Sequence, residues 1–204
     1  MSTIDWPEAI LPASWDWGVR KAGTQFRGPF NGTSQAVDFV ADRWLLTIGL
    51  PPKRRGPAAG AVRALLNHLA GGVNRVRVWD VGSGLKRAPG EPCGTMRGTP
   101  VLFSGAARGD AQLVIGTDPF VTLLAGDMLG CGGQLFQVRS DCAANNLGVI
   151  TVPLVLRVRG TIAGATAVVW YRPTAEFCMP SFTARHATGP THLLPSQFDL
   201  EEVY

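Results

Sequence analysis

Short runs of alternating apolar and polar residues, separated by turn residues, constrain the fold of this chain more than any other feature. An alternation with a period of two is typical of strands that bury one face. No helical segments separate the runs, so a chain of βαβ units with a parallel sheet is not expected. We therefore predict a mainly β protein, an antiparallel β-sandwich or barrel with one packed α-helix. The predicted strands cover residues 36–50, 75–80, 99–103, 111–115, 120–124, 134–139, 147–152, 154–159, 166–172, 175–182 and 198–204.

One segment, at about residues 57–70, has the period of a helix instead. Pro57 suits the first helical position, where its missing N–H costs nothing, and Gly71-Gly72 supplies the stop. Apolar residues recur at helical spacing on one face, which is typical of a helix packed against a core. These residues are Ala58, Val62, Leu65, Leu66 and Leu69.

A glycine cluster at Gly130-Cys131-Gly132-Gly133 looks like a nucleophile turn only superficially. It lies between two predicted strands, whereas the nucleophile elbow joins a strand to a helix. Adjacent glycines between alternating runs are typical of a tight hairpin, because both central residues of such a turn need a positive φ. We predict a hairpin here.

The N-terminal part differs from the rest in being rich in aromatic residues and prolines. We expect residues 1–35 to form an aromatic arm with loops, and residues 36–204 to form a single β-rich domain with one helix. Trp15-Asp16-Trp17 alternates like an edge strand. Trp6, Trp15 and Trp17 have two interpretations: they cap the core, or they anchor a contact with another chain, since Trp and Arg are favoured at the centres of interfaces.

No constellation of residues with recognisable chemistry emerges, so we predict no enzyme, no cofactor and no metal. The four cysteines show no paired spacing of the zinc-site kind and lie far from the three histidines. Gly82-Ser83-Gly84 is not followed by the Lys-Ser or Lys-Thr pair of a phosphate-binding loop. The cysteines are Cys93, Cys131, Cys142 and Cys178, and we expect them to be reduced.

The charge pattern favours contacts with proteins. Only 17% of the residues are charged, and the net charge of +4 comes mostly from arginine. Three adjacent cations, Lys53, Arg54 and Arg55, lie between prolines. They form a solvated turn, a small nucleic-acid footprint or an intersubunit contact with the acidic C-terminal strand, at Asp199, Glu201 or Glu202. Without interleaved aromatics the nucleic-acid footprint is small, so nucleic acid is not expected as a partner.

The chain's ends and apolar runs predict no membrane association. The N-terminus has no basic region followed by an apolar run, so no secretory signal is expected. No apolar run approaches the length of a spanning helix.

Several segments together resemble tailed-bacteriophage virion proteins of the distal tail or tail-tip type. They are Phe26–Gln35, Asp42-Arg43-Trp44, the helix at 58–72, Arg75–Trp79, Leu124–Leu129 with the hairpin at 132–138, Gly148–Leu156, Thr174–Phe177 and the acidic C-terminal strand. The resemblance covers roughly residues 12 to 204. It implies a β-rich baseplate or tail assembly subunit that forms a homo-oligomeric ring, with six copies as the expected number, and joins the tail tube to host-recognition parts. The implied partners are further copies and other tail proteins such as tube, hub or fibre. The implied location is the virion tail, after synthesis in the host cytoplasm. The family has no catalytic residues to transfer.

Three alternatives remain open: a tail-tube adaptor, a receptor- or carbohydrate-binding β-sandwich, and a small hydrolase. Exposed tryptophans lining a shallow groove favour a binding module. A pocket that joins a histidine to a carboxylate and a hydroxyl favours a hydrolase.

Overall fold

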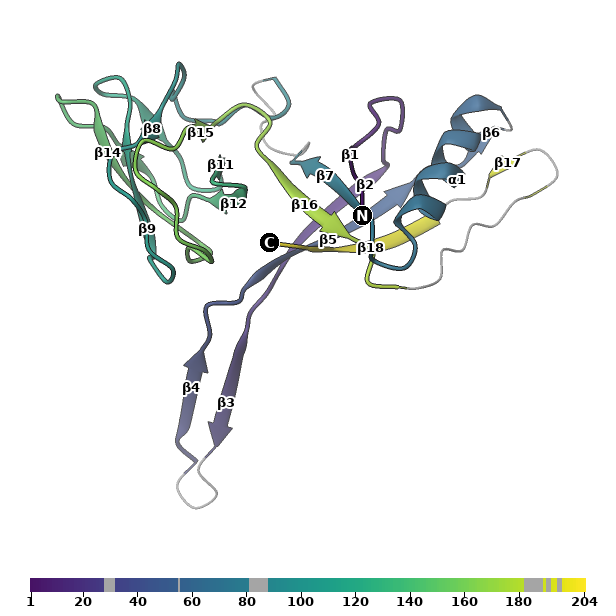
Figure 1. The fold of residues 1–204 in the computed structure, drawn as a ribbon, viewed down its shortest axis with the longest axis horizontal. Helices are drawn as coiled ribbons and strands as arrows, with labels where there is room; N and C mark the ends of the chain where they lie inside the picture. The colour runs from purple at the N-terminus through teal and green to yellow at the C-terminus, as the bar shows by residue number, and fades with distance from the viewer. Residues whose placement is uncertain (28–31, 55, 81–87, 182–188, 190–191, 194–195) are drawn as a thin grey trace. The chain divides into compact units, whose positions relative to one another are not determined.

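The computed structural model of the chain describes residues 1–27, 32–54, 56–80, 88–181, 189, 192–193 and 196–204. The described residues confirm a mainly β fold with one helix, and none of their sheets closes into a barrel (Figure 1). The elements are β1 (Thr3–Asp5), β2 (Ser14–Arg20), β3 (Gly23–Arg27), β4 (Ser34–Asp38), β5 (Arg43–Leu50), β6 (Lys53–Arg54), α1 (Pro57–Leu69), β7 (Arg75–Trp79), β8 (Val101–Leu102), β9 (Gln112–Gly116), β10 (Thr122–Leu123), β11 (Met128–Cys131), β12 (Gln134–Gln137), β13 (Cys142–Ala143), β14 (Val149–Pro153), β15 (Val168–Val169), β16 (Thr174–Cys178), β17 (His192–Leu193) and β18 (Ser196–Glu202).

The chain forms two compact units. The first contains Met1–Gly18, Trp44–Gly82 and Thr174–Tyr204, and the second contains Val19–Arg43 and Ser83–Pro173. In the first unit β7 pairs with β16, with Trp79 opposite Thr174. The segment between β7 and β16, which contains Ser83–Pro173, is therefore an insertion into the first unit. It begins after Trp79 and ends before Thr174, two residues that are paired in the sheet. This division differs from the expected one of an arm at 1–35 and a single domain at 36–204, because β1 and β2 are strands of the first unit's sheet.

The first unit is built on a six-stranded sheet in the order β1-β7-β16-β18-β5-β2. All pairs with a described register are antiparallel except β1 with β7, which is parallel. β2 lies at one edge, as the Trp15–Trp17 alternation predicts. One face of the sheet is buried, because alternate residues of each long strand are apolar. The buried residues include Leu46, Ile48, Val76, Val78, Phe177 and Leu200.

The helix α1 completes the core of this unit. Pro57 occupies its first turn, and the helix ends at Leu69, before two glycines with positive φ, Gly71 and Gly72. The sequence prediction is thus confirmed at both ends. Its buried stripe contains four of the five predicted residues, Val62, Leu65, Leu66 and Leu69. The fifth, Ala58, is exposed, and its neighbour Ala59 is buried instead.

The predicted strand at 36–50 is two strands, because a buried carboxylate interrupts the ladder. Asp42 is only 3% exposed, and its two oxygens accept hydrogen bonds from the Ala22 backbone N–H (2.9 Å) and the Lys21 ammonium (2.6 Å). These side-chain bonds occupy the break between two ladders, that of β2 with β5 and that of β3 with β4. The result is that β3 and β4 form a separate two-stranded hairpin.

The second unit packs three small sheets around one apolar core. The sheets are β10-β13, β12-β11-β15 and β14-β9-β8, all antiparallel. Seventeen buried residues form the core, among them Leu113, Ile115, Phe136 and Ile150. The β11–β12 hairpin turns at Gly132 and Gly133, both with positive φ, which confirms the predicted turn.

The prediction of a strand at 154–159 is wrong, although apolar and polar residues alternate in this segment. Leu154, Leu156 and Val158 are buried. The backbone, however, bonds to several different partners: Val155 N–H to the Gln137 carbonyl, Val158 N–H to the Asp110 carbonyl, and Arg159 N–H to the Gln134 side chain. Alternating burial therefore arose here without a ladder.

Candidate assembly surface

The three predicted tryptophans lie half-buried against aromatic residues of the first unit. Trp6 packs on Trp15 (ring centroids 5.2 Å apart) and stacks on Phe198 (6.4 Å). Trp17 makes edge contacts with Trp44 and Phe177, both at 5.8 Å. These contacts support the interpretation that the rings cap the core; an anchoring contact with another chain stays a prediction.

The predicted cation cluster is only partly described. Lys53 and Arg54 form β6, which pairs with β17 in the register His192 opposite Arg54, so this segment is more than a loop. Arg54 is exposed, while Arg55 and the side chain of Lys53 lie outside the described residues.

The three predicted acidic residues have different surroundings, although all lie on β18. Asp199 is exposed and accepts a hydrogen bond from the Thr47 hydroxyl at 2.6 Å. Glu201 is half-buried. Glu202 is 1% exposed and accepts the Trp44 backbone N–H at 3.0 Å. Glu202 therefore belongs to the interior of the sheet and is a poor partner for a neighbour's arginine, because reaching it would require opening the core.

The hairpin of β3 and β4 is the most exposed part of the described chain: all ten residues of its strands are exposed. Directly opposed residues share a face of a hairpin. Thr24 opposes Val37 and Phe26 opposes Gln35, so these four residues form one face, which we call the hairpin apolar face. It carries no charge, and Phe26 is 58% and Val37 36% exposed. The opposite face holds Gly23, Gln25, Arg27, Ser34, Ala36 and Asp38.

Sequence reasoning missed this hairpin by assigning its first strand to an arm and its second to a longer strand. The signal that would have found it is the Asn31-Gly32 pair between two alternating runs, since Asn-Gly is a strong hairpin marker. Phe26 and Phe39, the latter 53% exposed, also stand out as aromatic residues outside any predicted core.

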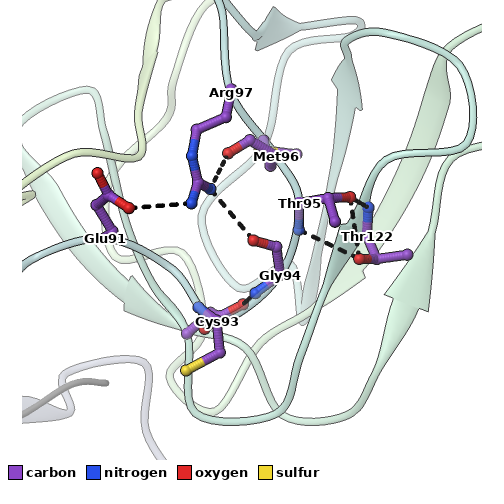
Figure 2. A network of polar contacts seen from close by, with 8 residues as sticks. Glu91, Cys93, Gly94, Thr95, Met96, Arg97 and Thr122 are labelled. Atoms are coloured by element: carbon purple, nitrogen blue, oxygen red, sulfur yellow. Dashed lines mark hydrogen bonds and ion pairs between the residues drawn. The ribbon is translucent and has the colours of Figure 1, made fainter. Parts of the chain in front are cut away.

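A polar network in the second unit fixes the segment 91–97 (Figure 2). The Arg97 guanidinium donates to the Gly94 and Met96 carbonyls and pairs with Glu91 at 3.2 Å. It also lies 5.0 Å from the centre of the Trp170 ring. Thr95 and Thr122 exchange side-chain and backbone bonds, as Figure 2 shows. Since Arg97 is engaged on several sides, the network is structural.

A depression of about 270 Å³ beside this network has polar walls but no histidine. Its lining residues are Arg97, Thr99, Pro100, Gly116, Thr117 and Asp118. Hydroxyl, carboxylate and guanidinium groups are present, yet the histidine expected beside them in a hydrolase is not among the lining residues.

A hydroxyl–imidazole pair occurs in the first unit, where Ser2 Oγ lies 3.1 Å from His68 Nε2. A nucleophile–base pair needs a third group that orients the ring. Asn74 instead bonds the Ser2 backbone N–H and the His68 carbonyl. These contacts tie the N-terminus to the end of α1, so the pair has a structural explanation.

None of the four cysteines is in a disulfide, and their thiols have different surroundings. Burial raises the pKa of Cys131 to about 11. Burial also raises the pKa of Cys142 to about 11, and the nearby Asp127 and Asp141 carboxylates add to this effect. Cys93 is exposed.

We expect iodoacetamide at pH 8 to modify Cys93 at least 100-fold faster than Cys131 or Cys142 in the folded protein. Only the thiolate reacts, and a thiol with a pKa of about 11 is only about one part in a thousand ionised at pH 8. Peptide mass spectrometry over a time course measures the rates. The Cys131 and Cys142 rates should rise roughly tenfold per pH unit below a pH of about 11. Equal rates for the three thiols before unfolding would contradict this prediction.

No protein-family model matches this chain, and the comparison with curated proteins found no match. In the part of the chain that the structure describes, no helix is long and apolar enough to span a membrane. Nor do three or more His, Cys, Asp or Glu side chains gather as metal ligands among those residues.

Proposed function

We propose that this chain is a self-assembling structural subunit, and that its copies form a ring in the tail of a bacteriophage virion. The observation that carries the self-assembly is the exposed hairpin β3–β4. A two-stranded hairpin is at best marginally stable in water on its own. One that also exposes Phe26 and Val37 on an uncharged face gains stability when a partner covers that face.

The assignment to a phage tail rests on the ordered resemblance of the segments between residues 12 and 204 to distal tail proteins. In such a ring, for which we expect six copies, the chain joins the tail tube to host-recognition components. The half-burial of Trp6, Trp15 and Trp17 removes the main argument for a carbohydrate-binding groove. The lining of the depression does not include the histidine that the hydrolase alternative calls for.

The self-assembly is tested by placing two charges on either face of the hairpin. In Phe26→Glu with Val37→Glu, both changes lie on the hairpin apolar face; in the control, Gln25→Glu with Ser34→Glu, both lie on the opposite face. All four positions are exposed, so both variants should fold. Mass photometry and sedimentation at micromolar concentration give the oligomeric state.

We expect the wild type and the control to form the same closed oligomer and the Phe26/Val37 variant to be monomeric. Each apolar side chain loses roughly 1.5–3 kcal/mol of burial in the contact, and the new carboxylates must be desolvated as well. A monomeric wild type at tens of micromolar would refute the self-assembly. Electron microscopy of phage particles labelled with an antibody against the chain tests the tail location, and label absent from tails would refute that part.

A further inference from the structure

A second uncovered apolar surface lies on the outside of the β14-β9-β8 sheet of the second unit. The register places Val101 and Val149 on either side of Gly116, and Thr151 opposite Val114. Directly paired residues share a face. Phe103, whose N–H bonds the Val114 carbonyl at 2.8 Å, extends the same face. We call it the outer sheet face; it contains Val101, Phe103, Gln112, Val114, Gly116, Val149, Thr151 and Pro153.

The alternate residues of these strands show that this is the outer side. Leu102, Leu113, Ile115, Ile150 and Val152 are each at most 1% exposed and belong to the core of the second unit. The residues between them point away from that core. Phe103 is 68% and Val101 38% exposed.

The composition of the outer sheet face is unusual for a surface in contact with water. None of its eight residues is charged, whereas the solvated face of an antiparallel sheet is normally polar. Phe103 alone leaves more than 100 Å² of aromatic surface exposed, at ~200 Å² per ring side chain. An uncharged apolar patch of this kind marks a contact with another macromolecule.

The hairpin apolar face matches this surface in charge, shape and length. Neither face carries a charge, so their contact buries no unpaired ion. Both are faces of twisted antiparallel strands, which pack on one another with interdigitating side chains. β3, β4, β9 and β14 are each five residues long, about 17 Å at ~3.4 Å per residue.

We propose that the hairpin apolar face of one copy packs on the outer sheet face of a second copy. This inference rests on the proposed self-assembly and names the acceptor surface for the hairpin. The two surfaces differ, so the contact is heterologous: each copy donates one hairpin and accepts one. Contacts of this type generate rings when the rotation between copies closes.

The heterologous arrangement is tested by mixing two variants that each lack one surface. Phe26→Glu removes the hairpin apolar face but keeps the acceptor, and Phe103→Glu removes the acceptor but keeps the hairpin. Thr151→Glu, an exposed change on the same sheet face, is the second acceptor variant should Phe103→Glu fold poorly. Val73→Glu is the matched control, because Val73 is 61% exposed and lies outside both surfaces.

We expect Phe26→Glu and Phe103→Glu each to weaken self-association at least 100-fold, and Val73→Glu to leave it unchanged. Native mass spectrometry of an equimolar mixture of the two variants should then show a 1:1 complex of twice the monomer mass, with no closed ring. In that complex the intact hairpin of one variant occupies the intact acceptor of the other.

The other outcomes separate this inference from the proposed function. If Phe26→Glu is monomeric while Phe103→Glu and Thr151→Glu assemble normally, self-assembly through the hairpin stands and the acceptor assigned here is wrong. The same conclusion follows if both single variants are monomeric but their mixture forms no 1:1 complex, because an intact hairpin and an intact acceptor would then fail to bind each other. If Phe26→Glu assembles as the wild type does, the proposed function fails as well.

Discussion

Replacing Asp127 with alanine is expected to lower the free energy of unfolding of the second unit by about 3–5 kcal/mol. Asp127 is 2% exposed, and its carboxylate accepts three backbone N–H groups. They belong to Cys93 (2.6 Å), Gly94 (3.0 Å) and Leu124 (2.8 Å). Hydrogen bonds to a charged group contribute about 1.5–3 kcal/mol each, and buried donors left without a partner add a desolvation cost.

The matched control is Asp141→Ala, because Asp141 is exposed and accepts one backbone N–H, that of Ala125 at 2.8 Å. Its expected cost is about 1 kcal/mol or less. Hydrogen exchange of amides between residues 94 and 170, followed by mass spectrometry, reads the stability of the second unit in the intact chain. A loss below about 1 kcal/mol for Asp127→Ala would show that the three donors find other partners, and that the carboxylate does not hold this segment.

The hydrogen bonds of Asp127 are a feature that could not be predicted from the sequence. The hairpin that follows it was predictable, because Gly132-Gly133 between two alternating runs is a local signal. Two of the residues that donate to the Asp127 carboxylate, Cys93 and Gly94, lie more than thirty residues before it, in a stretch that lacks the two-residue period of a strand. A hydrogen bond between segments so far apart leaves no periodic mark in a sequence.

The division into two units was hidden for the same reason. The first unit is assembled from three separate segments, and β7 and β16 pair across the whole insertion. Each strand was visible locally, yet which strands pair is decided by packing. The helix needed no such information, because its period, its proline and its glycine stop all lie within sixteen residues, 57–72.

The sequence could predict that the protein has contact surfaces, but not which residues form them. Low charge, tryptophan and arginine indicated a protein with extensive contacts. Trp17, however, packs on Trp44 and Phe177, and Glu202 is buried. The exposed apolar side chains lie instead on the hairpin and on the outer sheet face. Both surfaces emerge from strand register, because a shift of one residue would exchange Phe26 and Gln25 between faces.

The second large effect is expected at Gly94, where an alanine would collide with backbone. A methyl group there would contact the Thr122 carbonyl oxygen and lie 2.6 Å from Leu123 Cα. Neither side can move away easily. Met96 N–H bonds the Thr122 carbonyl, Thr95 and Thr122 bond each other, and β10 is paired with β13. Gly94 itself is tied to Asp127 through its N–H.

We therefore expect Gly94→Ala to destabilise the second unit by about 2–4 kcal/mol, near or above the usual cost of overpacking a core.

Gly60→Ala is the matched control: Gly60 is exposed on α1, and an added methyl group meets nothing within 4 Å. Because alanine has a higher helix propensity, that change should stabilise the first unit by about 0.5–1 kcal/mol. Hydrogen exchange reports the stability of each unit separately. Glycine-to-alanine changes should therefore raise the free energy of unfolding at Gly60 in α1 and lower it at Gly94 beside β10. A neutral Gly94→Ala would mean that the 94–96 segment is free to move off β10, and that the close packing between them does not stabilise the second unit.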